Sequence, residues 1–186
     1  MNRNLILKTL GLVLLCEAAA MVPSLLLSLY YREADLGAFG FSIIFTGLVG
    51  GTLAVVPVQS KQVGYREGFT IATLSWLFTA GFGSLPFAFS GVLGGVDAFF
   101  ETMSGFTTTG ASVLKDVEVL PHGLLFWRSL THWLGGMGTI VLILALIPSL
   151  KIAGMQLYKA EVPGPTKSKV LPRIAQATRQ LYKVYL

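Results

Sequence analysis

The amino-acid sequence predicts an all-α polytopic membrane protein, with two N-terminal transmembrane helices followed by one helix–re-entrant pore loop–helix unit. Three observations lead to this fold class. Only 12% of the 186 residues are charged, against roughly 25% in an ordinary soluble domain. The stretches 36–60, 68–96 and 129–150 carry no charge, and each can cross a hydrocarbon layer of about 30 Å, which needs ~20 residues. Between the last two lies a shorter segment, rich in threonine and glycine, that is poor material for a membrane-spanning helix.

Residues 1–66 are expected to form the two N-terminal transmembrane helices. The first, Leu5–Tyr30, is interrupted only by Lys8 and Glu17. It is too long for the apolar region of a signal peptide, and no small-residue cleavage site follows it. The second is expected over Leu36–Val58. Glu17 can bind a proton or a cation, but a satisfied polar contact between helices is the preferred interpretation.

The next unit, residues 67–150, is expected to contain two full spans with a short helix between them. The spans are Gly68–Phe89 and Gly123–Ile147. Phe99, Met103 and Phe106 recur on one helical face and predict a helix over Asp97–Phe106, with Asp97 as its N-cap. Such a helix is about 15 Å long at 1.5 Å per residue, half the hydrocarbon thickness. It must therefore enter the membrane and return, which is tolerated only where the backbone is buried in protein or lines water.

The distribution of charge predicts the orientation. The third segment, 151–186, holds seven basic residues and one acidic residue, which indicates the cytoplasmic face by the positive-inside rule. The same rule places the N-terminus in the cytoplasm and the acidic stretches 32–35 and 115–118 outside. The basic segment lacks the interleaved aromatic residues of a nucleic-acid platform, so the lipid bilayer is the expected partner and nucleic acid is not.

The run Thr107-Thr108-Thr109-Gly110-Ala111 is a candidate ion path. Backbone carbonyls can replace the hydration shell of a cation, as in selectivity filters. Gly110 supplies the backbone freedom that lets neighbouring carbonyls face the same way, and threonine hydroxyls can bond to the backbone behind them. The alternative is a simple threonine- and glycine-rich turn in an external loop.

Two charges in the membrane interior are expected to support this run. Glu101 lies on the short helix, and Arg128 lies about six residues into the following span, at similar depth. Because an unpaired charge in this environment is expensive, Arg128 is expected either to contact Glu101 or the carbonyl end of the short helix, or to extend to the membrane surface.

Glycines and histidines of the last span suggest further roles. Gly135, Gly136 and Gly138 indicate close helix packing through small residues, with a gating hinge as the functional alternative. His122 and His132 are separated by about 15 Å along one helix and cannot share a metal ion. The sequence contains no phosphate loop, Cys-x-x-Cys or His-Glu-x-x-His motif, so neither an enzyme nor an organic cofactor is expected.

Two motifs resemble the Trk/Ktr/HKT superfamily of potassium transporters, and most of all its TrkH-type membrane subunits. They are DAFFETMSGFTTTGA over 97–111 and FWRSLTHWLGGMG over 126–138, and the segment KAEVPGP over 159–165 is also similar. The resemblance implies four helix–pore loop–helix units in one polypeptide, with four loops forming one filter. It makes Gly110 the filter glycine and places K⁺ at Thr108, Thr109 and Gly110. It also implies a homodimer in the bacterial inner membrane, gated by a cytosolic TrkA-type nucleotide-binding ring.

The sequence departs from that pattern because it contains one pore unit and no second TTTG-like loop. The expectation is that the chain is the N-terminal portion of a longer transporter, completed by further repeats of the same polypeptide or by other copies. The expected function is potassium ion uptake, driven by the membrane potential or by symport with a coupled ion. The alternative is a non-conducting membrane scaffold or accessory subunit whose pore-like loop only packs.

Overall fold

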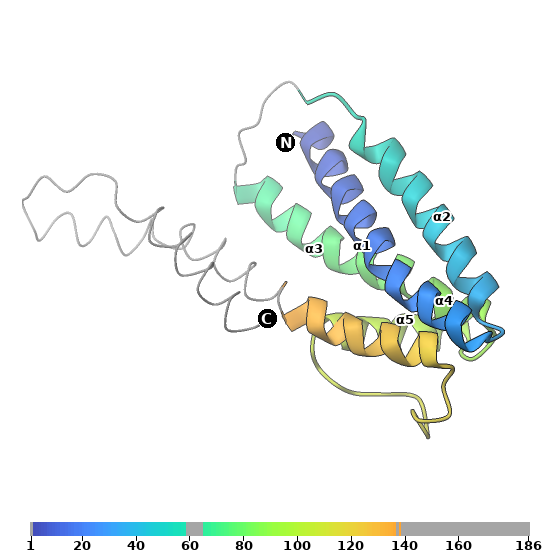
Figure 1. The fold of residues 1–186 in the computed structure, drawn as a ribbon. Coiled ribbons are helices and arrows are strands. Elements are labelled where there is room, and N and C mark those ends of the chain that lie inside the picture. The colour runs from blue at the N-terminus through green and yellow to red at the C-terminus, as the bar shows by residue number, and fades with distance from the viewer. Residues whose placement is uncertain (1, 59–64, 137, 139–186) are drawn as a thin grey trace, which may run out of the picture. The chain divides into compact units, whose positions relative to one another are not determined.

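The computed structural model describes residues 2–58, 65–136 and 138, and within these ranges the chain is helical with no strand. Its helices are α1 (Arg3–Tyr31), α2 (Leu36–Ala54), α3 (Tyr65–Gly83), α4 (Leu85–Phe89), α5 (Gly95–Phe106) and an unlabelled helix over 122–136, drawn in orange in Figure 1. The candidate site lies in the compact unit Met1–Gly135. The predicted helix end at Ile147 and the predicted segment 151–186 fall outside the described residues.

The first two helices form an antiparallel hairpin (Figure 1). A Cβ added to Gly50 of α2 would lie 3.0 Å from the carbonyl oxygen of Gly11 of α1, so the two backbones approach closely because both positions lack a side chain. The expected end of α2 at Val58 is wrong, since the helix stops at Ala54. Pro57 has no N–H and disfavours helical geometry in the residue before it, which explains the early end.

The third predicted span is divided into α3 and α4, with Ser84 between them. Pro86 is the cause, because it cannot donate a backbone hydrogen bond and its ring clashes with the carbonyl four residues earlier. The stretch Arg66–Phe89 is still long and apolar enough to cross a membrane, as are α1 and α2. The described part of the chain therefore contains three candidate spans by length and composition.

The helix before the candidate site is short, as expected, but it begins earlier. α5 has 12 residues and starts at Gly95, with Gly94 as its N-cap, so the expectation of Asp97 as N-cap is wrong. Asp97 instead lies in the first turn, where its carboxylate stabilises the positive end of the helix dipole. At 1.5 Å per residue α5 is about 18 Å long, well short of a bilayer crossing.

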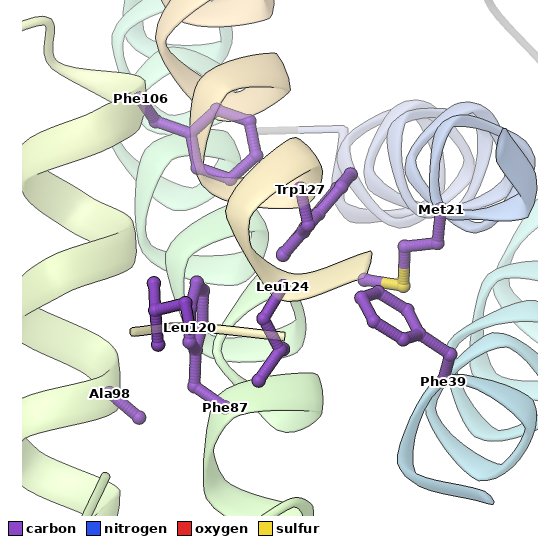
Figure 2. Packing of buried hydrophobic residues seen from close by; sticks show 8 residues of the cluster. All are labelled: Met21, Phe39, Phe87, Ala98, Phe106, Leu120, Leu124 and Trp127. Atoms are coloured by element: carbon purple, nitrogen blue, oxygen red, sulfur yellow. The ribbon is translucent and has the colours of Figure 1, made fainter. Parts of the chain in front are cut away.

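A cluster of buried apolar side chains joins these helices behind the candidate site (Figure 2). Its members are Met21, Phe39, Phe87, Ala98, Phe106, Leu120, Leu124 and Trp127. Trp127 is fully buried, and its Nε1–H donates to the carbonyl of Gly83 at 2.8 Å, because a buried indole needs a partner for its donor. Its ring meets that of Phe106 edge-on, with centroids 6.3 Å apart. The core therefore ties the end of α3 and the end of α5 to helix 122–136.

Candidate functional site

The C-terminal end of α5 is closed by a pair of backbone hydrogen bonds. Thr108 N–H donates to the Gly105 carbonyl at 2.9 Å, and Thr109 N–H donates to the Ser104 carbonyl at 3.0 Å. This is the Schellman pattern, which normally places glycine at the left-handed position. Here that position is Thr108, with φ = 56°, a conformation that is strained for a β-branched residue. The threonine run therefore ends the helix, and the N–H groups of Thr108 and Thr109 are directed back toward it.

After this turn the chain returns along α5. The Ser104 hydroxyl donates to the carbonyl of Ala111 at 2.6 Å, and Glu101, one turn nearer the start of α5, binds Ser112 and Val113. Away from the turn, residue numbers therefore increase along the returning segment and decrease along α5. Residues 107–110 are consequently the tip of a hairpin whose two arms are α5 and the segment 111–114.

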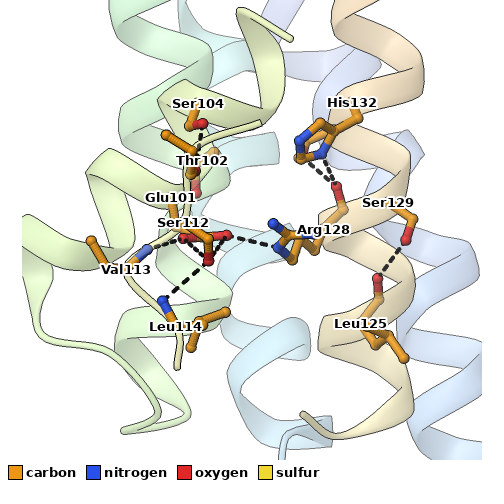
Figure 3. Close-up of polar contacts among 12 residues, drawn as sticks. Glu101, Thr102, Ser104, Ser112, Val113, Leu114, Leu125, Arg128, Ser129 and His132 are labelled. Carbon is orange, nitrogen blue, oxygen red and sulfur yellow. Dashed lines mark hydrogen bonds and ion pairs between the residues drawn. The ribbon is translucent and has the colours of Figure 1, made fainter. Parts of the chain in front are cut away.

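Glu101 holds the two arms together (Figure 3). Its side chain is 1% exposed. The carboxylate accepts the Ser112 hydroxyl at 3.0 Å, the Val113 N–H at 3.0 Å and the Nε–H of Arg128 at 2.7 Å. Arg128 is 18% exposed, so the charge pair is largely desolvated and its hydrogen bonds are strong. The structure thus brings Glu101 and Arg128 together, and the same carboxylate binds the returning segment at Ser112 and Val113.

The carbonyl oxygens of the hairpin tip differ from that of Ala111 in whether they accept a hydrogen bond. In the described part of the chain, the carbonyls of Thr107, Thr108, Thr109 and Gly110 accept no hydrogen bond, whereas that of Ala111 accepts one from Ser104. All five residues are exposed, although Ser104, Gly105 and Phe106 just before them are buried. The tip therefore presents unpaired backbone oxygens on a braced support.

The backbone of the tip alternates in hand. Thr107 has φ = −77°, Thr108 has φ = 56° and Gly110 has φ = 76°, whereas Thr109 does not have a positive φ. In a uniform extended strand successive carbonyls point to opposite sides, and alternating left- and right-handed residues turn them toward the same side. The Thr107 hydroxyl bonds the Met103 carbonyl at 2.8 Å and lies 2.9 Å from the Thr109 hydroxyl, so these side chains are occupied within the hairpin.

Helix 122–136 runs beside α5 in the same direction, and the two helices approach closely at two glycines. A Cβ on Gly105 would collide with Thr131, and one on Gly135 would collide with the backbone of Phe106. These contacts fit the predicted close packing through small residues at Gly135. The hinge role of Gly135, Gly136 and Gly138 stays a prediction.

The start of helix 122–136 is joined to the loop between α1 and α2. The His122 ring stacks on that of Tyr31, with centroids 4.0 Å apart, and its Nδ1 lies 2.7 Å from Glu33 Oε1. Partial burial raises the pKa of Glu33, but hydrogen bonds from His122 and Gly123 and the charge of His122 outweigh it, so that this pKa lies below its ordinary value. Nearby Asp35 is buried, and burial raises its pKa.

One expectation about a buried charge is wrong. Glu17 was expected to make a satisfied polar contact, yet in the described residues neither of its buried oxygens has a hydrogen-bond partner. No group of three His, Cys, Asp or Glu side chains able to hold a metal ion occurs there. His132 is bonded instead to the carbonyl of Arg128 at 2.9 Å.

Sequence reasoning did not single out the serines that brace the tip. Ser104 donates to the Ala111 carbonyl and Ser112 donates to Glu101, each across the hairpin. The sequence offered one weak signal, which is that Ser104 lies three residues after Glu101 on the same face of α5. Their role depends on the return of the chain, which the spacing alone does not specify.

Comparison with known proteins agrees with this architecture. The family model of TrkH, described as a cation transport protein, matches residues 37–186. The Trk system potassium uptake protein TrkH of Halomonas elongata is 40% identical over 192 residues, covering 100% of this chain and 39% of that protein. The protein of the same name from Escherichia coli K12 is also 40% identical, over 191 residues. The chain thus spans about two fifths of the length of these curated relatives.

A solved structure extends the similarity to three dimensions. The crystal structure of the potassium transporter TrkH from Vibrio parahaemolyticus superimposes with a TM-score of 0.82 at 32% identity, over 100% of this chain and 37% of that one. With its three long apolar helices, the chain is a multi-pass membrane protein. The matched family is one of transporters and is not an enzyme family. The chain belongs to the TrkH family of cation transport proteins.

Proposed function

We propose that this chain supplies one pore loop to a filter for potassium ion uptake across the bacterial inner membrane. The observation that carries the proposal is the hairpin tip, where the carbonyls of residues 107–110 are exposed and accept no hydrogen bond from the described protein. Such oxygens can replace the hydration shell of a monovalent cation. K⁺ is assigned to Thr108, Thr109 and Gly110, with Thr107 and Ala111 completing the run.

The hairpin is proposed to be re-entrant. α5 is too short to cross the bilayer. The His122–Glu33 contact puts the start of helix 122–136 beside the loop between α1 and α2, and α5 starts toward the same end because it runs parallel to that helix. With the N-terminus in the cytoplasm, that end is outside. The carbonyl end of the α5 dipole then faces the ion path, which favours a cation.

The rest of the filter must come from other pore loops, since one loop supplies a quarter of a ring. The relatives named as potassium uptake proteins are more than twice as long as the matched chain, which supports further repeats in one polypeptide. A homodimer and a cytosolic TrkA-type ring remain part of the proposal, as does symport with a coupled ion.

Glycine substitutions at two matched positions test this function. Gly110 has φ = 76° and Gly91 has φ = 75°, and a Cβ would meet nothing within 4 Å at either site. Alanine therefore introduces the same backbone strain, of about 1–2 kcal/mol, at both. In the full-length gene product, Gly110→Ala should abolish growth of an uptake-deficient bacterium at low potassium and lower rubidium uptake, whereas Gly91→Ala should support both.

A non-conducting scaffold would give a different result. In that case the tip only packs, and Gly110→Ala and Gly91→Ala should have equal effects on growth at equal membrane expression. Equal effects of the two substitutions would overturn the transport proposal.

A further inference from the structure

Glu17 occupies the centre of the longest helix. It is the middle residue of α1, because 3–16 and 18–31 are of equal length, and its side chain is 4% exposed. Both carboxyl oxygens are buried and lack a hydrogen-bond partner among the described residues. This is the reverse of the normal treatment of a buried acid, which is paired or hydrogen-bonded.

The carboxyl group lies directly behind the candidate ion path. A Cβ on Gly83 would be 2.6 Å from Glu17 Oε1, 2.9 Å from Thr102 Cγ2 and 3.0 Å from Phe106 Cε2. Thr102 and Phe106 belong to the last two turns of α5. Glu17 therefore meets the side of α5 near its carbonyl end, where the helix dipole is negative.

The polar groups around this carboxyl are already occupied. The Gly83 carbonyl accepts from Trp127, and the Thr102 hydroxyl donates to the Ala98 carbonyl at 2.8 Å. Arg128 is bound to Glu101. Of these neighbouring groups in the described chain, none has a free donor for a carboxylate at Glu17. Ionising Glu17 there would add a negative charge beside a negative dipole end.

Other titratable groups on the surrounding elements do not reach it. α2 carries no charged residue between Leu36 and Ala54. The titratable side chains on the remaining elements are Arg3, Lys8, Cys16, Tyr30 and Tyr31 of α1, Tyr65, Arg66 and Glu67 of α3, Asp97 and Glu101 of α5, and His122, Arg128 and His132 of helix 122–136. Glu17 has no hydrogen bond or ion pair with any described residue.

We propose that Glu17 is a proton-binding site: its carboxyl is neutral in the conducting form, and loss of the proton to water places a charge behind the tip and lowers ion flux. An ionised carboxylate without donor or countercharge is too costly in this position. The part that concerns flux rests on the proposed transport function. The part that concerns the proton does not, and is measured separately.

Infrared spectroscopy of the full-length gene product in lipid tests the proton directly. The difference spectrum between the parent protein and Glu17→Gln at neutral pH should contain the carbonyl-stretch band of a protonated carboxylic acid. Glu101→Gln is the matched control, since Glu101 is an ion-paired carboxylate and its replacement should leave the band unchanged. Absence of this band from the parent-minus-Glu17→Gln difference spectrum, or its loss in Glu101→Gln, would overturn the proposal.

Rubidium uptake as a function of pH tests the link to the tip. Uptake by the parent protein should fall by about fivefold or more from neutral to alkaline pH, which is the lower end of ordinary coupling between sites. Glu17→Gln should keep the neutral-pH rate throughout, and Glu17→Met should do the same if the amide disturbs packing. If uptake by both variants falls with pH as it does in the parent protein, the coupling between Glu17 and the tip is refuted. Absence of uptake at every pH, with the infrared band intact, would instead refute the transport function.

Discussion

Two buried glutamates, Glu101 on α5 and Glu17 beside it, differ in their hydrogen bonding. Glu101 accepts hydrogen bonds from a hydroxyl, a backbone N–H and a guanidinium, whereas Glu17 has no partner in the described chain. Their exposed fractions are alike, at 1% and 4%. Burial alone therefore says little about a carboxyl group, and its partners decide whether it is ionised and structural or neutral and able to exchange a proton.

Removing the charged partner of Glu101 should produce the largest effect, because it leaves a buried carboxylate without its countercharge. Arg128→Met strands a buried carboxylate and should lower the free energy of unfolding by about 3–5 kcal/mol, measured by thermal unfolding of the full-length gene product in detergent. The double variant Glu101→Gln with Arg128→Met should recover part of that loss. Strict additivity of the two single changes would contradict the coupling of the pair.

A smaller effect is expected where helix 122–136 docks on α5. Gly105→Ala forces a Cβ against Thr131 and should cost about 1–3 kcal/mol through overpacking. Gly40→Ala is the matched control, since Gly40 lies inside α2 with nothing within 4 Å of an added Cβ. There alanine should be neutral or stabilising, by up to about 1 kcal/mol. Equal unfolding temperatures for the two variants would show that the close approach is unimportant to Glu101 and its surroundings.

The second brace of the hairpin should be weaker than the ion pair. Ser104→Ala removes the hydroxyl that bonds the Ala111 carbonyl and should cost about 1 kcal/mol, with a fall in rubidium uptake. Ser129→Ala removes a hydroxyl bonded to the Leu125 carbonyl at 3.0 Å on an exposed face of helix 122–136. It should leave uptake unchanged. A loss of uptake in both variants would point to general helix destabilisation.

Glu33 lies between the two extremes, since it is paired but partly exposed, and it should give the smallest effect. Its pKa is lowered in the folded protein, so its contribution is present above the ordinary pKa of 4.5 and is lost as pH falls through the lower folded value. At neutral pH, Glu33→Gln should cost less than about 1 kcal/mol. The difference between parent and variant should vanish in thermal unfolding at strongly acidic pH, and a difference that grows there would contradict the sign.

Much of the arrangement could be predicted along the chain. The charge-free stretches located α2 and the span broken at Pro86, and a long apolar segment interrupted only by Lys8 and Glu17 located α1. The apolar spacing of Phe99, Met103 and Phe106 located α5. The helix ends expected at Val58 and Asp97 were less accurate, because Pro57, three residues after the end of α2, and the Gly94 N-cap of α5 act over a single turn. The contact between Glu101 and Arg128 could be anticipated since both charges had to be placed at similar depth in an apolar layer.

By itself the sequence determined that the chain is a helical membrane protein with a short helix and a threonine–glycine run between spans, because hydrophobic length and periodicity are local properties. Only the tertiary structure decided which polar groups found partners. The return of residues 111–114 along α5 gave Glu101 its donors and Ser104 its acceptor. The packing of α1 against Gly83, Thr102 and Phe106 left Glu17 without a hydrogen-bond partner among the described residues. Hydrogen bonding is directional and short-ranged, so it is determined by contacts between segments distant in the chain.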